Sequence, residues 1–318
     1  MNREQIHIIA RHSDWSSEDI EKALQKKVYP SPRSWQLFIK WACLAIGLSF
    51  FVAGIVFFFA SNWQHLHKFT KLGILIGAII IVVSFSLYPK LEPLIRKILL
   101  TVASVLTGVL FAVFGQVYQT GANAYEMFLA WMALTMVWVI VAKFPVLWLL
   151  YIVLGNITWF TYVAQGGSGY IYDLRFEINA ILNFFIFVLA TKKPALFIED
   201  RKIPNWFLFI IAIPAVAMYV AALINALATT EVVLPLARSL GIGLVIGSYL
   251  YDYGMKRKSI LYHVLVGLSI VLVGMLLIGR FVDNYANFGL YFNSIYVLVS
   301  VGAMSIFFLR LVKKWRHE

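Results

Sequence analysis

Cysteine and charge are the two features that this chain has least of. Cys43 is its single cysteine, so a disulfide framework and a cysteine-based metal site are both excluded. Charged residues make up only 13% of the sequence, whereas hydrophobic residues make up 61%. A soluble domain could not cover that much apolar surface. The composition therefore predicts an integral membrane protein.

Catalytic signatures are also missing. The sequence contains no HExxH, no GxSxG and no pair of aspartates inside an apolar segment. A catalytic site built from Glu126 or Asp283 with Tyr118 stays open, but an enzyme is the least expected class. No cofactor and no metal are expected. The first 28 residues hold several acids and no continuous apolar core, so no cleavable signal peptide is expected either.

Apolar segments of membrane-spanning length fill the chain from Trp41 to Leu309. A helix needs about 20 mostly apolar residues to cross a bilayer. Ten segments come close to that length: 41–60, 72–88, 98–118, 127–142, 146–163, 174–190, 205–226, 232–250, 259–278 and 289–309. Two are weaker, because 127–142 is short and followed closely by the next, and 174–190 carries Asn179 and Asn183.

The predicted fold class is an all-α polytopic membrane protein with about ten transmembrane helices. A cytoplasmic helical segment over 1–34 precedes the transmembrane bundle over 35–318. In the N-terminal segment, Asn2 with Gln5 and Ser16 with Asp19 are spaced to cap two short helices. This segment is expected to lie on the membrane surface or to bind a partner protein.

The basic residues lie in alternate gaps between the apolar segments. If the N-terminus is cytoplasmic, most of the 27 Lys and Arg residues fall on the cytoplasmic side. The outer side receives Lys68, Lys71, Arg175 and Arg280. Both termini are therefore expected to be cytoplasmic, in a bacterial inner membrane. Glu126, Asp173, Glu177 and Asp283 are counted as outer acids.

The net charge of +12 does not indicate a nucleic-acid partner. The excess positive charge falls on the predicted cytoplasmic side, where membrane topology accounts for it. The expected partners of those residues are the lipid bilayer and its anionic headgroups. No nucleic acid is expected to bind.

Two stretches resemble a known family. Residues 55–75 contain an Asn-Trp-Gln turn between two apolar segments, and residues 114–131 begin Phe-Gly-Gln-Val-Tyr-Gln-Thr-Gly. With the N-terminal helical pair, they resemble a bacterial family of predicted membrane proteins catalogued as domain of unknown function 2157, over about residues 1–150. The resemblance implies a bacterial inner-membrane location and no particular activity. In the usual form of the family's second motif, an acidic residue and an aromatic residue follow the glycine. This pair is absent after Gly121.

Both stretches fall in loops expected to face outward. Their polar side chains can satisfy the free backbone groups of helix ends, which is the simpler interpretation. The alternative is that the two loops form one externally open polar pocket lined by Gln116, Tyr118, Glu126 and Asn62.

Arg238 is the costliest side chain in the chain, because it lies about 9 Å inside an apolar segment. Glu231 is two helical turns earlier on nearly the same face, and Pro235 between them is expected to interrupt the helix. Such a group is typical of a solute or proton site. The alternative is that Arg238 extends to the outer headgroups and pairs loosely with Glu231.

The remaining polar residues in apolar segments have simpler interpretations. Asn156, Asn179, Asn183, Asn225 and His263 are expected to join helices by hydrogen bonds. Ser239, Gly243 and Gly247 predict a ridge for close helix packing.

The expected function is therefore the non-enzymatic handling or transport of a small solute, ion or lipid through a polar site near the outer face. The alternative is a membrane scaffold or sensor subunit that works with a partner.

Overall fold

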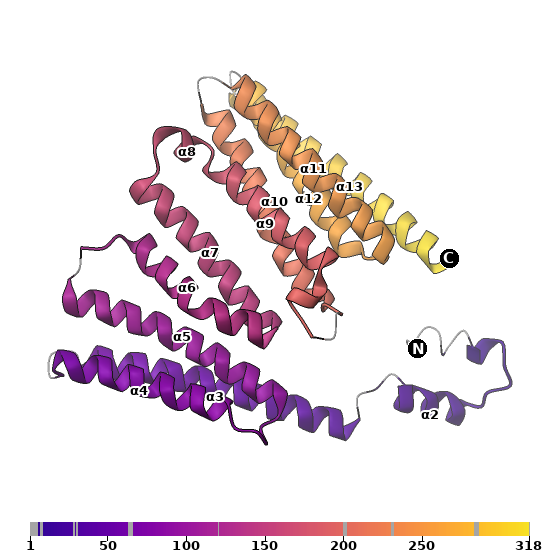
Figure 1. Cartoon of the computed structure of the whole chain (residues 1–318). Coiled ribbons are helices and arrows are strands. Elements are labelled where there is room, and N and C mark those ends of the chain that lie inside the picture. Colours follow the sequence, from indigo (N-terminus) through magenta and orange to yellow (C-terminus); the bar gives the residue numbers. More distant parts are fainter. Residues whose placement is uncertain are drawn as a thin grey trace. The chain divides into compact units, whose positions relative to one another are not determined.

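A computed structural model describes residues 6, 9–27, 29, 31–62, 66–119, 121–199, 202–229, 232–282 and 286–317. Helices dominate these residues, which contain no strand (Figure 1). The helices are α2 (Ser17–Lys27), α3 (Pro32–Asn62), α4 (Lys68–Ser86), α5 (Pro93–Tyr118), α6 (Ala124–Ala142), α7 (Pro145–Gly166), α8 (Gly169–Asp173), α9 (Arg175–Lys192), η1 (Pro194–Leu196), α10 (Asn205–Ala228), α11 (Val233–Arg257), α12 (Ile260–Val282) and α13 (Ala286–His317). The predicted cap formed by Asn2 and Gln5 lies outside the described residues.

Nine of the described helices, α3 to α7 and α10 to α13, are long and apolar enough to cross a membrane. The remaining predicted segment, 174–190, forms α9, whose 18 residues rise about 27 Å. Three charged residues, Arg175, Glu177 and Lys192, lie within these 18 residues, whereas each of the other nine helices has an 18-residue apolar stretch with at most two. The predicted class, an all-α polytopic membrane protein with about ten spans, is confirmed.

The chain divides into two compact units, Met1–Val113 and Phe114–Glu318. The first contains α2 to α4 and most of α5. Its helix α3 exposes large apolar side chains such as Phe50 and Phe57, each 73% exposed, as expected for a helix surrounded by lipid. Near the start of α3, Lys40 Nζ lies 2.9 Å from Glu92 Oε2 in an exposed ion pair.

Helix α2 begins with the predicted capping box. The Ser16 hydroxyl donates to Asp19 Oδ2 at 2.7 Å, and the Asp19 backbone N–H donates to Ser16 Oγ at 3.2 Å. The hydrogen bonds from the Ser16 side chain and backbone hold the pKa of the Asp19 carboxyl below its usual value. The cap therefore stabilises α2 at neutral pH and weakens in acid, as the pH falls through this lowered pKa.

In the second unit, α6 and α7 form the tight hairpin that their short connection predicts. Lys143 takes a left-handed conformation with φ 43°, and its N–H donates to Val139 O. Pro145 then occupies the first turn of α7, where its missing N–H costs nothing. The two helices lie side by side along their lengths.

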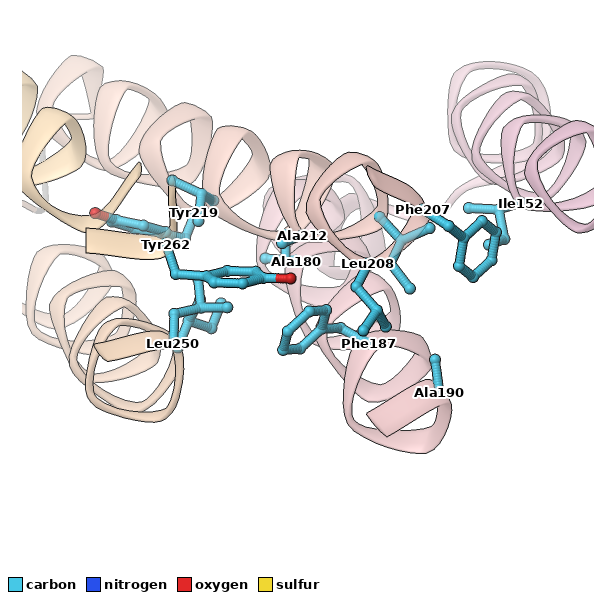
Figure 2. Packing of buried hydrophobic residues seen from close by; sticks show 14 of the residues in the cluster. Ile152, Ala180, Phe187, Ala190, Phe207, Leu208, Ala212, Tyr219, Leu250 and Tyr262 are labelled. Atoms are coloured by element: carbon cyan, nitrogen blue, oxygen red, sulfur yellow. The ribbon is translucent and has the colours of Figure 1, made fainter. Parts of the chain in front are cut away.

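Helix α10 lies in the middle of the second unit, where it packs against α7, α9, α11 and α12. Small residues let its neighbours approach closely, because Ala212, Ala215 and Ala226 are each at most 1% exposed. Around it, Phe187 of α9 meets Tyr262 of α12, with ring centroids 6.0 Å apart (Figure 2). Leu250 of α11 packs into the same cluster.

The predicted small-residue ridge of α11 packs closely at Gly243. A Cβ atom added there would lie 2.8 Å from Cε2 of Tyr219 in α10, closer than van der Waals contact allows. Gly241 on the same helix has no such neighbour within 4 Å. Glycine is therefore required at position 243 by the approach of α10, and not at position 241.

We expect Gly243→Ala to destabilise the protein by about 1 kcal/mol or more, because the Tyr219 ring must shift to make room for the methyl group. The matched variant Gly241→Ala should leave the stability unchanged or raise it, since alanine favours helix. Thermal unfolding of the two variants in the same detergent measures the difference. Equal unfolding temperatures would contradict the close contact.

Candidate functional site

Arg238 forms a buried ion pair with Glu177. Its Nη2 lies 2.9 Å from Glu177 Oε1, and its Nε donates to the same oxygen at 3.3 Å. The Ser239 hydroxyl donates to this oxygen as well, at 3.3 Å. The Glu177 side chain is 3% exposed and that of Arg238 is 32% exposed. The pair therefore joins α9 to α11, with its acid enclosed and its base partly accessible.

The two charges meet because α9 and α11 run in the same direction. Helix α10 runs back between them, so the N-terminal ends of α9 and α11 lie at the same end of the bundle (Figure 1). Glu177 is the third residue of α9 and Arg238 the sixth of α11. An acid in the first turn also interacts favourably with the positive end of the helix dipole.

Arg238 has a partner, Glu177, that was not expected. Glu231, the predicted partner, lies outside the described residues. Glu177 was expected to be an acid on the outer face, but the structure buries it within the bundle. Sequence reasoning missed its role, although an acid inside a weak apolar segment was a usable signal.

The expected interruption of the Arg238 helix is wrong. Helix α11 begins at Val233 and continues to Arg257, so Pro235 is its third residue. The N–H groups of the first turn have no acceptor within a helix, and proline therefore breaks no hydrogen bond there. Arg238 lies on a continuous helix, and its ion pair comes from tertiary packing.

One oxygen of Glu177 has no partner among the described residues. All three donors, two from Arg238 and one from Ser239, reach Oε1, while Oε2 is buried with no hydrogen bond. A buried carboxylate oxygen in this state carries a desolvation cost. A donor group of a solute placed against Oε2 would lower that cost.

A second arginine lies at the same end of the bundle. Arg175 Nη2 donates to Oδ1 of Asn225 in α10 at 2.9 Å, and its Nη1 donates to Tyr172 O at 2.6 Å. Its guanidinium stacks 4.0 Å from the Tyr172 ring centroid. Trp159 Nε1 donates to Arg175 O at 2.8 Å. These contacts form a polar-aromatic layer, and Asn225 joins helices as predicted.

The face of α9 that lies away from Glu177 carries a cluster of amide side chains. Asn183 Nδ2 donates to Oδ1 of Asn156 in α7 at 2.8 Å and to Asn179 Oδ1 at 2.9 Å, and Asn156 Nδ2 donates to Asn183 Oδ1 at 3.1 Å. Asn179 and Asn183 are each 2% exposed. The prediction that these three residues join helices by hydrogen bonds is confirmed.

The predicted loop site is only partly described. Glu126 is exposed and caps its own helix, accepting a hydrogen bond from Asn123 N at 3.2 Å and one from Tyr125 OH at 3.2 Å. Gln116 and Tyr118 are exposed at the end of α5. The side chain of Asn62 lies outside the described residues. A pocket that unites these four residues stays a prediction.

Metal-ligating side chains are not grouped in the described part of the chain. Within the described ranges, no group of three His, Cys, Asp or Glu side chains is placed to hold a metal ion. Arg238 and Ser239, the groups around Glu177, both donate hydrogen bonds and so favour a negatively charged oxygen between them.

These features define a multi-pass helical membrane protein with a buried ion pair near one end of its bundle. Residues 13–148 match the family model described as "Predicted membrane protein (DUF2157)", which confirms the resemblance inferred from the two loop stretches. No curated protein and no solved structure matches the chain. The family match ends within α7, so Glu177 and Arg238 lie beyond it.

We expect Glu177→Leu to destabilise the protein by roughly 3 kcal/mol, because it leaves the Arg238 charge without a partner. The partial exposure of Arg238 keeps the effect at the lower end of the range for buried pairs. The double variant Glu177→Leu, Arg238→Leu should cost less than the sum of the two single changes. Unfolding in mixed micelles measures each free energy.

Asp252→Ala provides the control for this cycle. Asp252 pairs with Lys256 at 2.6 Å, also on α11, but both side chains are more than half exposed. Its removal should change the stability by less than about 1 kcal/mol. Additive effects of the Glu177 and Arg238 changes would contradict an energetic coupling between the two side chains.

Proposed function

We propose that this protein moves a small anionic solute across the membrane without catalysing a reaction, and that Glu177 and Arg238 form the binding site. The observation that carries the proposal is the ion pair itself, in which a buried acid neutralises a partly exposed arginine within a bundle of membrane-spanning helices. Ionisable residues inside a membrane are expensive and are concentrated along solute pathways.

Electrostatics supports an anion as the solute. With Glu177 ionised, the pair is neutral and Arg238 has little attraction for an anion. Once Glu177 takes up a proton, the guanidinium charge is uncompensated and favours a carboxylate or a phosphate-like oxyanion. The first turns of α9 and α11 add positive dipole ends beside the site. A proton and an anion would therefore bind together.

The exposure of the two side chains supports an order of events. Glu177 is enclosed, whereas about a third of the Arg238 side chain is accessible. An incoming anion would meet Arg238 first and displace the carboxylate. The buried Glu177 would then carry the proton, because an unpaired negative charge costs several kcal/mol inside a protein.

We also propose the orientation derived from the basic loops, in a bacterial inner membrane with both termini cytoplasmic. The basic loops would lie against anionic headgroups, and residues 1–34 would be available to a partner protein. With the native Cys43 replaced by serine, Ser168→Cys should react in intact cells with a membrane-impermeant maleimide, and Glu199→Cys should react only after lysis. The reverse labelling pattern would overturn the orientation.

Transport can be tested in proteoliposomes with lactate, phosphate and sulfate as probes. A gradient of the transported anion should carry protons with it, as reported by a pH-sensitive dye trapped inside. Arg238→Gln should abolish anion flux. Glu177→Gln should keep anion binding but remove its pH dependence, because the residue then stays neutral.

Lys256→Gln provides the matched control, because it removes an exposed basic residue from the same helix. It should transport as the wild type does. Unchanged flux in Arg238→Gln would refute the proposed site. If the wild type carries none of the three anions and the variants differ only in stability, the pair is structural and the scaffold or sensor alternative is favoured.

A further inference from the structure

A cavity of about 410 Å³ lies on the side of α9 away from the ion pair. It is formed by α6, α7, α9 and the segment around η1. Asn179 and Glu177 are two residues apart, so they point to nearly opposite faces of α9. The cavity is therefore separate from the site proposed above, and its size falls within the range of small-molecule sites.

Most of the cavity wall is apolar and aromatic. Trp148 and Tyr151 of α7 and Phe197 after η1 supply rings, and Trp148 and Phe197 have centroids 4.6 Å apart. Leu182, Ile140 and Leu196 also line the cavity and are each 46–47% exposed. These three exposed residues mark a mouth on the surface of the bundle, within reach of molecules dissolved in the bilayer.

Asn179 supplies an unused hydrogen-bond donor to this apolar space. It lines the cavity and is 2% exposed. Its Oδ1 accepts from Asn183 Nδ2, but its own Nδ2 donates to no described residue. Exchanging the amide O and N would leave one polar atom of Asn179 without a partner in the same way. A ligand that accepts a hydrogen bond from this N–H gains affinity, because the contact forms within an apolar surrounding.

Trp148 adds its aromatic ring to the same wall, but its N–H does not open into the cavity. Its indole Nε1 is buried with no hydrogen-bond partner in the described part of the chain. The neighbouring amides cannot relieve Asn179, because Asn156 and Asn183 are already bonded to each other in both directions. The wall thus combines aromatic rings and apolar side chains with the amide of Asn179.

We propose that this cavity binds a neutral, membrane-soluble carbonyl compound of the quinone type. A quinone carbonyl accepts the Asn179 N–H, its flat ring lies against Trp148, Tyr151 and Phe197, and its hydrocarbon tail leaves between Leu182, Ile140 and Leu196. A charged ligand is disfavoured because the lining residues carry no charge. The proposal concerns binding and involves no electron transfer.

Decylubiquinone and the full chain in lipid nanodiscs provide the test. Because Trp148 lines the cavity, bound quinone should quench tryptophan fluorescence in a saturable way, above the linear quenching caused by quinone dissolved in the lipid. Decylbenzene, added as a competitor with the same tail and no carbonyl, should displace the quinone poorly. Equal displacement by decylbenzene, or quenching that never saturates, would overturn the proposal.

Asn179→Leu tests the donor, since leucine has the same branched arrangement of four side-chain heavy atoms and lacks the amide. Asn183 Nδ2 still has Asn156 Oδ1 and the Asn179 backbone oxygen as acceptors, so the neighbouring amides stay satisfied. We expect about a tenfold loss of affinity, the effect of one buried hydrogen bond. Unchanged affinity in this variant would refute the role of Asn179.

Two neighbouring residues on α9 are exposed, so substitutions there are expected to leave the fold intact. Leu182 lines the mouth and Ile181 does not, and their side chains are 46% and 50% exposed. Leu182→Phe should narrow the mouth and lower the affinity several-fold, whereas Ile181→Phe should bind as the wild type does. Equal affinities for the two variants would place the quinone elsewhere. Failure of anion transport would leave all these binding results unaffected.

Discussion

A charged side chain in a bundle surrounded by hydrocarbon is stable only where another charge or water compensates it, and in the second unit Glu177 and Arg238 compensate each other. Their contact joins α9 to α11 at one end of the bundle. It also accounts for the place in the bundle of α9, a helix with three charged residues in 18. Helix α9 belongs in the bundle because its buried polar side chains face other helices.

The rest of the second unit is arranged so that this contact can form. Alanines on the central helix α10 let α9 and α11 approach from either side, and Gly243 admits the Tyr219 ring. Helix α9 carries buried polar side chains on two of its faces. Glu177 faces α11, and Asn179 with Asn183 faces α7. A charged solute at one face and a neutral ligand at the other would both act on the same helix.

Much of the fold could be predicted from local pattern. The α6–α7 hairpin, the Ser16–Asp19 cap and the close-packing ridge at Gly243 each depend on residues near one another in sequence, and each is confirmed. Arg238 could be singled out because any arginine in an apolar segment needs an explanation. Its partner could not be singled out in this way, because Glu177 lies 61 residues away in the sequence. The nearer acid, Glu231, has the spacing expected for a pair on one helix.

The sequence by itself determined that this is a multi-pass membrane protein, where its helices run and which arginine is costly. Hydropathy, charge and helix capping depend on residues close together in the sequence, so they can be predicted from the sequence alone. Only the tertiary structure decided that Glu177 is buried, that Pro235 lies in the first turn of a continuous helix and that Asn179 borders a cavity. Those outcomes depend on which helix faces meet, and packing between distant segments sets that choice.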